Sequence, residues 1–509
     1  MLQLSNRTGR RTRCTAVAAV LALTGMSVAA LSTAGPAALA DSGRSAAVSA
    51  AASAGLSAAS AGAPDAVVRV DGRRRLQPID GFGFAQAFQR ATIMRGDRGL
   101  SPANQRRVLD LLMDPRTGAG LSILRLGIGS SDPAPYDLMP TIQPVDPGGP
   151  AAPPRYVWDG DDGGQVWMAQ RAKEYGVRRF YFDAWSAPAY MKTNGTDTNG
   201  GTLCGLPGTD CASGDWRQAY ANYLIQFVRF YRQEGIRITD LGFTNEPDFV
   251  ASYASMIFTP EQAADMVKVL GPTIKRSRLP LNLICCDGAD WTDSIGYSAA
   301  IEADPAADRW VGTHAGHVYG GPAEVPLPTD ARTWMSEWNP NGNTWNEAWD
   351  DGSGWAGITI AESIHNSLAV ANNSAYVYWF GASIGATRAL IQLASEGDGV
   401  AVSKRLWALA AYSRFIRPGA VRIAADASDP ALKVTAFRNR GGSTVVELLN
   451  TATTPVRTGV AVGRAGSRAT TYRTDETHSL ERIGTGRVFG GRLPVTLPAR
   501  SLTTVVLTG

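Results

Sequence analysis

The chain has 509 residues, of which 44% are hydrophobic and 18% charged, with 55 Gly, 29 Pro and 13 Trp. This composition excludes an intrinsically disordered chain, a collagen and a coiled coil. The formal charge is +4, but residues 1–40 hold four Arg and no Lys, Asp or Glu, so a chain cleaved after Ala40 keeps 45 basic and 45 acidic residues. The basic character therefore belongs to the N-terminus, and no nucleic-acid partner is expected.

The first 40 residues have the pattern of a secretory signal peptide. Four arginines in Arg7–Arg13 precede an apolar run from Ala16 to about Leu31, and the small-residue site Ala38-Leu39-Ala40 follows. A membrane anchor is the alternative. Residues 41–65 are rich in Ala and Ser and predict a disordered leader. No later stretch reaches the roughly 20 apolar residues of a membrane helix, so we expect a secreted protein without a membrane partner. We also expect it to be a monomer.

Four cysteines follow residue 40. Cys204 and Cys211 bracket a short Gly/Pro loop, CGLPGTDC, which predicts a disulfide in an oxidising compartment. Cys285 and Cys286 are adjacent, and both a vicinal disulfide and two buried thiols stay open. The CxxC and HExxH spacings of zinc sites are absent from the sequence, so no metal is expected.

From residue 79 to 410 the sequence repeats one pattern. Short apolar runs alternate with amphipathic stretches about a dozen residues long, which is typical of βα units around a buried parallel sheet. The eight runs are 81–84, 122–129, 179–185, 241–246, 282–287, 312–319, 333–338 and 375–380. Eight such units predict an α/β fold, a closed (β/α)8 TIM barrel, with helices at 216–233 and 259–275 among those between the strands.

A second domain is expected after the barrel. Alternating short strands with Gly-rich turns, such as 433–437, 443–449 and 501–507, predict a side β-sandwich domain over residues 411–509. Residues 66–78 precede the first barrel strand, and we expect them to supply a strand that pairs with this domain.

Two glutamates stand at the ends of predicted barrel strands. Glu246 ends the fourth run in Thr-Asn-Glu-Pro, and Glu337 ends the seventh in Met-Ser-Glu-Trp, 91 residues further on. Reactive groups of such barrels sit at the carboxyl ends of the strands, so both glutamates are expected over one rim. A paired-carboxylate site suits glycoside hydrolysis, in which one acid protonates the leaving oxygen and the other attacks the anomeric carbon. A helix-entry acid at Glu246 and a rim salt bridge at Glu337 are the alternatives.

Polar supports for this chemistry are also in the strands. Arg125 is a candidate cation beside the nucleophile, whose pKa should be lowered, and Asn245 is a candidate donor to a sugar hydroxyl. His314 and His317 point to opposite faces of a strand, so a metal pair is not expected, and His314 is interpreted as packing. His317 and Tyr319 share a face and could line the site, with Tyr319 orienting the nucleophile.

Aromatic residues near the strand ends fit a sugar platform. They are Trp185, Tyr319, Trp338 and Trp379. Flat apolar faces of this kind stack on pyranose rings, while core packing is the alternative for each.

These motifs together resemble a known family. Asn245-Glu246-Pro247 and Ser336-Glu337-Trp338 look like the retaining glycoside hydrolases of clan A. The stretch GFGFAQAFQRA at 81–91, Leu124-Arg125-Leu126-Gly127 and the trailing β domain resemble glycoside hydrolase family 30. The Ala-Phe-Gln-Arg stretch and the Cys-Cys-Asp of the fifth strand are most like the xylan-active subfamily known from fungi.

The resemblance implies roles for the residues. Glu246 would be the general acid/base and Glu337 the nucleophile of a double displacement with retained configuration, their carboxyl groups roughly 5–5.5 Å apart. Asn245 would face the sugar 2-hydroxyl, and Trp379 is the strongest aromatic candidate. Xylan-active members often recognise a glucuronate branch, for which Arg90, then Arg388, are candidates; an ion pair with a rim acid is the alternative.

The sequence therefore predicts a secreted retaining glycosidase that cleaves β-1,4-xylosidic bonds of xylan or glucuronoxylan without a cofactor. The same mechanism on a β-1,6-glucan or β-1,6-galactan, and a non-catalytic carbohydrate-binding barrel, are the alternatives. Endo and exo action both stay open.

Overall fold

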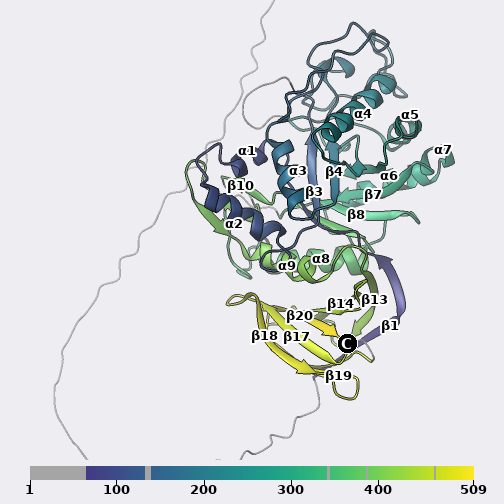
Figure 1. The fold of residues 1–509 in the computed structure, drawn as a ribbon. Helices are drawn as coiled ribbons and strands as arrows, with labels where there is room; N and C mark the ends of the chain where they lie inside the picture. The colour runs from purple at the N-terminus through teal and green to yellow at the C-terminus, as the bar shows by residue number, and fades with distance from the viewer. Residues whose placement is uncertain (1–64, 132–138, 341–343, 386–387, 464–465) are drawn as a thin grey trace, which may run out of the picture. The chain divides into compact units, whose positions relative to one another are not determined.

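The computed structural model describes residues 65–131, 139–340, 344–385, 388–463 and 466–509 (Figure 1). The predicted signal peptide and the leader up to residue 64 lie outside these residues. Within the described ranges, no helix has the length and hydropathy needed to cross a membrane.

Eight strands close into a parallel barrel, as the sequence predicts. The strands are β2 (Gly81–Ala85), β3 (Ile123–Ile128), β4 (Arg179–Ala184), β5 (Asp240–Leu241), β6 (Asn282–Gly288), β7 (Val311–His317), β8 (Arg332–Glu337) and β9 (Ala375–Tyr378). β9 pairs back onto β2, with Gly81 opposite Ala375. The strands read as continuous apolar runs because both of their faces are covered.

Helices alternate with the strands. They are α1 (Arg90–Arg95), α2 (Pro102–Met113), α3 (Gln165–Glu174), α4 (Arg217–Gln233), α5 (Pro260–Ser277), α6 (Trp291–Glu302), α7 (Pro305–Asp308), α8 (Gly357–His365) and α9 (Lys404–Phe415). Short turns η1 (Ala189–Met191) and η2 (Asn366–Val370) add to them. α5 begins after Thr259, whose hydroxyl accepts a hydrogen bond from the Gln262 amide while the Gln262 side chain accepts one from the Thr259 amide. This capping box fixes the start of the helix.

β5 is much shorter than the predicted run 241–246. A Cβ on Gly242 would lie 2.1 Å from the Asp183 carboxylate, so side chains from β4 already fill the space beside it. The Glu246 amide donates to the Asp287 carbonyl at 2.8 Å, and Glu246 has a φ of 47°. The chain therefore leaves the regular ladder after Leu241, and this departure brings Asn245 and Glu246 to the mouth of the barrel.

The second domain is a nine-stranded sheet in the order β18-β17-β20-β15-β14-β13-β1-β16-β19. Its strands are β1 (Ala66–Pro78), β13 (Val421–Ala427), β14 (Leu432–Arg438), β15 (Thr444–Asn450), β16 (Val456–Ala461), β17 (Arg468–Thr474), β18 (Ser479–Arg487), β19 (Arg492–Leu497) and β20 (Ser501–Thr508). Apolar residues of β16 and β19 pack in one buried cluster with those of β14, β15 and β20, so the sheet folds over on itself as a sandwich.

β1 joins the two halves of this sheet. It pairs antiparallel with β13 and parallel with β16, and Figure 1 shows it as the purple strand beside the green β13. The expected boundary at residue 411 falls inside α9, which continues to Phe415, so the β domain begins later than expected. A small sheet of β10 (Ala382–Ile384), β11 (Ile391–Leu393) and β12 (Val400–Val402) follows β9, and the sequence pattern did not indicate it.

Candidate active site

The two glutamates predicted at the strand ends face one cavity. Glu337 is the last residue of β8, Glu246 follows β5, and they are 4% and 7% exposed. One oxygen of each carboxylate and one ring nitrogen of His317 all lie within 4.8 Å of one another. Both glutamates line a cavity of about 390 Å³. Two carboxyl groups this close, in a site that a substrate can enter, can work on the same bond.

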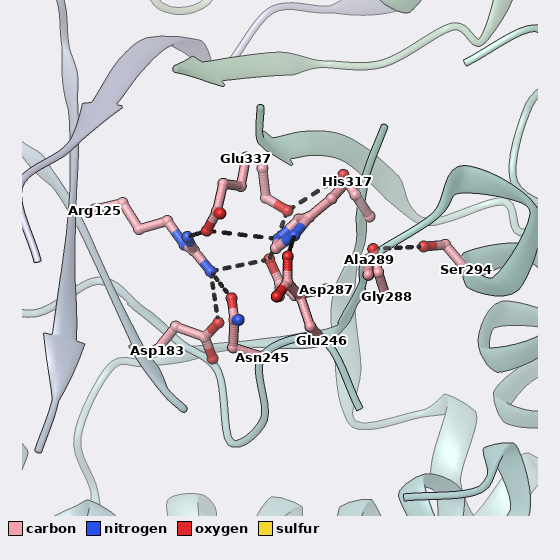
Figure 2. Close-up of polar contacts among 12 residues, drawn as sticks. Arg125, Asp183, Asn245, Glu246, Asp287, Gly288, Ala289, Ser294, His317 and Glu337 are labelled. Atoms are coloured by element: carbon pink, nitrogen blue, oxygen red, sulfur yellow. Dashed lines mark hydrogen bonds and ion pairs between the residues drawn. The ribbon is translucent and has the colours of Figure 1, made fainter. Parts of the chain in front are cut away.

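Glu337 is held by a cation and a phenol. Arg125 donates from one guanidinium nitrogen to Glu337 Oε2, and the Tyr319 hydroxyl donates to Oε1 at 2.9 Å. The other terminal nitrogen of Arg125 donates to Asp183 at 2.9 Å and to the Asn245 oxygen at 2.5 Å (Figure 2). Arg125 is fully buried, so these contacts fix its guanidinium plane. The orientation of Glu337 is set by this fork.

Glu246 faces an imidazole that is charged. His317 Nδ1 lies 3.2 Å from Glu246 Oε1, and Nε2 lies 3.3 Å from Asp287 Oδ1. Burial alone would lower the pKa of His317, but the charge of Glu337 and the contacts with Asp287 and Glu246 outweigh it and raise the pKa to about 10. The ring therefore carries a proton on both nitrogens at neutral pH.

The cluster holds more carboxyl groups than cations. Its carboxyl groups are Asp183, Glu246, Asp287 and Glu337, and its cations are Arg125 and His317. Burial and the neighbouring Asp287 raise the pKa of Asp183 well above its ordinary value. Burial raises the pKa of Glu337, against Arg125 and His317, while the charge of Glu246 adds to the rise. The expectation of a lowered nucleophile pKa is therefore wrong in direction, because burial outweighs the two cations.

Aromatic side chains form one wall of the cavity. Trp185, Trp379, Phe88 and Phe380 all line it. The Trp185 and Trp379 ring centroids are 5.8 Å apart, and the Arg125 guanidinium lies 4.7 Å from the Trp185 ring. Trp185 is 2% exposed, so Trp379 offers more of its ring to a ligand.

Trp338 does not join this wall. It lines a separate cavity with Val318 and Thr359 on the other side of Tyr319. Successive residues of a strand point to opposite faces, so a tryptophan directly after the inward-facing Glu337 turns outward. Its place as a substrate platform beside the glutamates was therefore predicted wrongly.

Both candidate arginines line the cavity of the two glutamates. Arg90 donates to the Phe88 carbonyl at 3.0 Å, and its guanidinium lies 4.9 Å from the Phe380 ring. Arg388 lies on the same cavity. An anionic group on a bound ligand would meet positive charge here.

Two further sets of side chains matter and were not predicted. Asp287 accepts hydrogen bonds from the Ser336 and Tyr181 hydroxyls, both at 2.5 Å. These bonds fix the carboxylate that contacts Nε2 of His317. Asp183 and Asp287 also lie near the carboxyl ends of barrel strands, β4 and β6. The reasoning that singled out the two glutamates by this position would have found both aspartates had it been applied to every acidic residue. Phe249 and Tyr253 also line the cavity, and they come from an irregular connection that has no periodic signal.

Two groups of side chains have metal-ligand geometry among the described residues. The first is Glu246, His317 and Glu337, and the second is Glu302, Asp308 and His314. In the first, the Arg125 guanidinium already contacts Glu337, and the His317 nitrogen that faces Glu246 carries a proton. The first group is therefore a charge-paired acid site. In the second, burial lowers the pKa of His314 to about 4 and keeps the ring neutral.

The disulfide predicted between Cys204 and Cys211 is present, with the Cα atoms 5.7 Å apart. Cys285 and Cys286, left open by the sequence, also form a disulfide, and they directly precede Asp287 in β6.

Comparisons with known proteins point to one family. The family model of the glycosyl hydrolase family 30 TIM-barrel domain matches residues 161–332, and that of the family 30 beta sandwich domain matches residues 419–505. The catalytic domain of GH30 xylanase C from Talaromyces cellulolyticus is 37% identical, with a TM-score of 0.80, over 87% of this chain and all of that one. The chain belongs to glycoside hydrolase family 30.

Relatives of this chain differ in what their names say they cleave. Glucuronoxylanase XynC of Bacillus subtilis is 25% identical over 57% of this chain. The match spans 66% of that relative, just under two thirds of its length. Endo-1,6-beta-D-glucanase neg1 of Aspergillus fumigatus is 24% identical over 67% of this chain and 71% of its own. Membership of family 30 thus shows the family of this chain and leaves its activity and its glycan to be argued.

Proposed function

We propose that this family 30 chain is a secreted retaining xylanase that cleaves β-1,4-xylosidic bonds of glucuronoxylan. The observation that carries the proposal is the pair Glu246 and Glu337, with one oxygen of each within 4.8 Å. Retaining glycosidases hold their carboxyl groups roughly 5–5.5 Å apart, whereas inverting enzymes leave about 6.5–9.5 Å for a water between them.

The contacts of each glutamate support the division of labour. Glu337, oriented by Arg125 and Tyr319, attacks the anomeric carbon, while Glu246 gives its proton to the glycosidic oxygen and the sugar chain beyond it leaves. Glu246 then removes a proton from water, which attacks the glycosyl–Glu337 ester and releases the sugar with its configuration retained. Asn245, fixed by its hydrogen bond to Arg125, is proposed to face the 2-hydroxyl of the sugar at the reacting carbon.

His317 acts through its charge. It faces Glu246 and, at 4.0 Å, Glu337 Oε2, so it stabilises whichever carboxylate is ionised during the two steps. Asp287 keeps the ring protonated and oriented. Trp379 supplies an apolar face for the sugar ring, and Tyr319 and Trp185 complete the walls around it.

Two lines support xylan with acidic branches as the substrate. The 37% identical solved relative is a xylanase, and the Bacillus subtilis relative is a glucuronoxylanase. In this chain, Arg90 and Arg388 lie on the cavity of the glutamates, where a guanidinium can bind a glucuronate carboxylate. The endo-1,6-glucanase relative supports β-1,6-glucan as the second candidate substrate. The signal-peptide pattern of residues 1–40 supports export.

Product analysis on several glycans tests the proposal. Reducing ends are measured with wild type and Glu337→Ala on glucuronoxylan, on xylo-oligosaccharides without branches and on β-1,6-glucan. We expect release from glucuronoxylan by wild type and a loss of at least about 10⁴-fold in the variant, as removal of a catalytic nucleophile requires. Equal release by both proteins would refute the catalytic assignment, and a preference for β-1,6-glucan would refute the substrate.

A further inference from the structure

The connection that follows Glu246 exposes an unusual amount of apolar surface. Phe249, Val250 and Tyr253 are 49%, 61% and 40% exposed. Across the ranges that the structure describes, nine large hydrophobic side chains are more than a third exposed, and three of them fall within residues 249–253. Phe249 and Tyr253 also line the cavity of the two glutamates. A gathering of exposed apolar side chains at the rim of a site indicates a surface that binds something.

This connection is held firmly in place. The Asn199 amide donates to the Ala251 carbonyl at 2.8 Å, and the Ser255 amide donates to the Asp197 carbonyl at 3.0 Å. The buried Lys192 ammonium donates to the Ser255 carbonyl at 2.6 Å. The connections after β4 and β5 therefore brace each other. The exposed rings belong to an ordered segment, as a binding platform requires.

The rings of Phe249 and Tyr253 extend the aromatic wall of the cavity beyond Glu246. Phe88 contacts Trp379 edge-on at 6.1 Å and Tyr253 edge-on at 5.8 Å, so it joins the two. Burial, followed by the charges of Glu246 and Glu337, raises the pKa of the Tyr253 phenol, which lies near both carboxylates. The wall thus runs from Trp379 to Tyr253 alongside the reacting groups.

The chemistry assigns an occupant to this end of the wall. The general acid must touch the leaving oxygen, so the group that leaves lies on the side of Glu246. We propose that Phe249 and Tyr253 form the platform on which the leaving sugar stacks. This proposal rests on the proposed function and names the part of the substrate that the segment after Glu246 recognises.

A sugar fits this platform better than an acyl chain does. Asp248 stands between Glu246 and Phe249 with an exposed side chain, and its carboxylate accepts from the Ala289 amide at 3.0 Å. Ala289 lines the same cavity. Flat rings beside an accessible carboxylate match the apolar face and the hydroxyl edge of a pyranose, whereas an acyl chain has no hydroxyl to donate to that carboxylate.

The test compares leaving groups on one glycone. kcat/KM is measured for wild type, Phe249→Ala and Tyr253→Ala on paired substrates in which a xylo-oligosaccharide glycone carries a xylosyl, a methyl or an octyl group. We expect each variant to lose on the order of tenfold with the xylosyl leaving group, as deletion of a stacking ring does. With the methyl group, which is too small to stack, each variant should lose several-fold less activity than with the xylosyl group. Phe489→Ala removes an equally apolar ring, 73% exposed in the turn between β18 and β19, and serves as the matched control.

Each outcome decides the matter. Equal losses with the xylosyl and methyl groups, or no loss with either, overturn the platform. Preference of the wild type for the octyl group, with the larger loss there, assigns the platform to a lipid and also overturns the proposal. Failure of the wild type on every xyloside refutes the proposed substrate instead, and the same comparison with a β-1,6-linked glucosyl and a methyl leaving group then tests the platform.

Discussion

His317 offers a test of the charge arrangement because its ring is positively charged at neutral pH, where a histidine is ordinarily uncharged. Replacing it with Gln keeps a polar side chain of similar length but removes the charge. Both ring nitrogens face carboxylates, Glu246 at 3.2 Å and Asp287 at 3.3 Å, so the substitution removes a cation that two buried acids share and leaves Asp287 with Arg125 at 3.7 Å.

The size of the effect follows from the pKa. It rises from the ordinary 6.5 to about 10 in the folded protein, although burial by itself would lower it. At about 1.36 kcal/mol per pKa unit, the charged ring contributes about 5 kcal/mol to the free energy of unfolding. Because the folded pKa is the higher one, this contribution is complete below pH 6.5, declines as the pH rises, and is gone above pH 10.

Urea unfolding of wild type and His317→Gln at pH 6, 8 and 10 measures the contribution of the charged ring to the free energy of unfolding. The difference in unfolding free energy should be largest at pH 6 and shrink by several kcal/mol toward pH 10. His314→Gln is the matched control on the same strand: burial lowers the pKa of His314 to about 4, so its difference should stay constant above pH 7. A His317 difference that does not change with pH would refute the charged ring.

Three further results are expected. Arg125→Lys keeps one charge but loses the fork that holds Glu337 and Asn245, so kcat on glucuronoxylan should fall at least about hundredfold, and an unchanged kcat would contradict this support. Because burial raises the pKa of Glu337 above its ordinary 4.5 and the attacking carboxyl must be ionised, kcat/KM should fall on acidification at a pH above that value; a profile flat down to it would contradict the assignment. Arg90→Ala should lower kcat/KM about tenfold on glucuronoxylan and leave unbranched xylo-oligosaccharides within about twofold, as reducing-end release measures; equal losses on both would remove its role toward glucuronate.

The barrel was predictable because each strand is buried on both faces and so reads as an apolar run. The two glutamates stood out for the same reason, since an acid at the end of such a run needs a partner or a use. Asn245, Arg125, Tyr319 and His317 follow from the strand-end rule and the alternation of side chains, and the structure brings them all within the hydrogen-bonded cluster of the glutamates.

The remaining features depend on contacts that a pattern does not carry. Trp338 follows Glu337 in sequence and was grouped with it, although alternation sends the two to opposite faces. The boundary was predicted inside α9, which contacts β2 of the barrel as well as β17, β18 and β20 of the β domain, although Pro418 and Gly419 follow the helix closely and mark its end. The short β5 and the path of the chain to Glu246 depend on contacts with residues far away in the sequence, such as the hydrogen bond from the Glu246 amide to the Asp287 carbonyl.

Trapping the covalent intermediate tests the central claim most directly. A 2-deoxy-2-fluoro xylobioside with a good leaving group forms the glycosyl-enzyme but slows its hydrolysis, because the fluorine destabilises the cationic transition state. We predict that mass spectrometry of the digested enzyme finds the added xylobiosyl mass on the peptide that contains Glu337. Label on Glu246 or on another residue, or no label on an enzyme that turns over glucuronoxylan, would contradict the account.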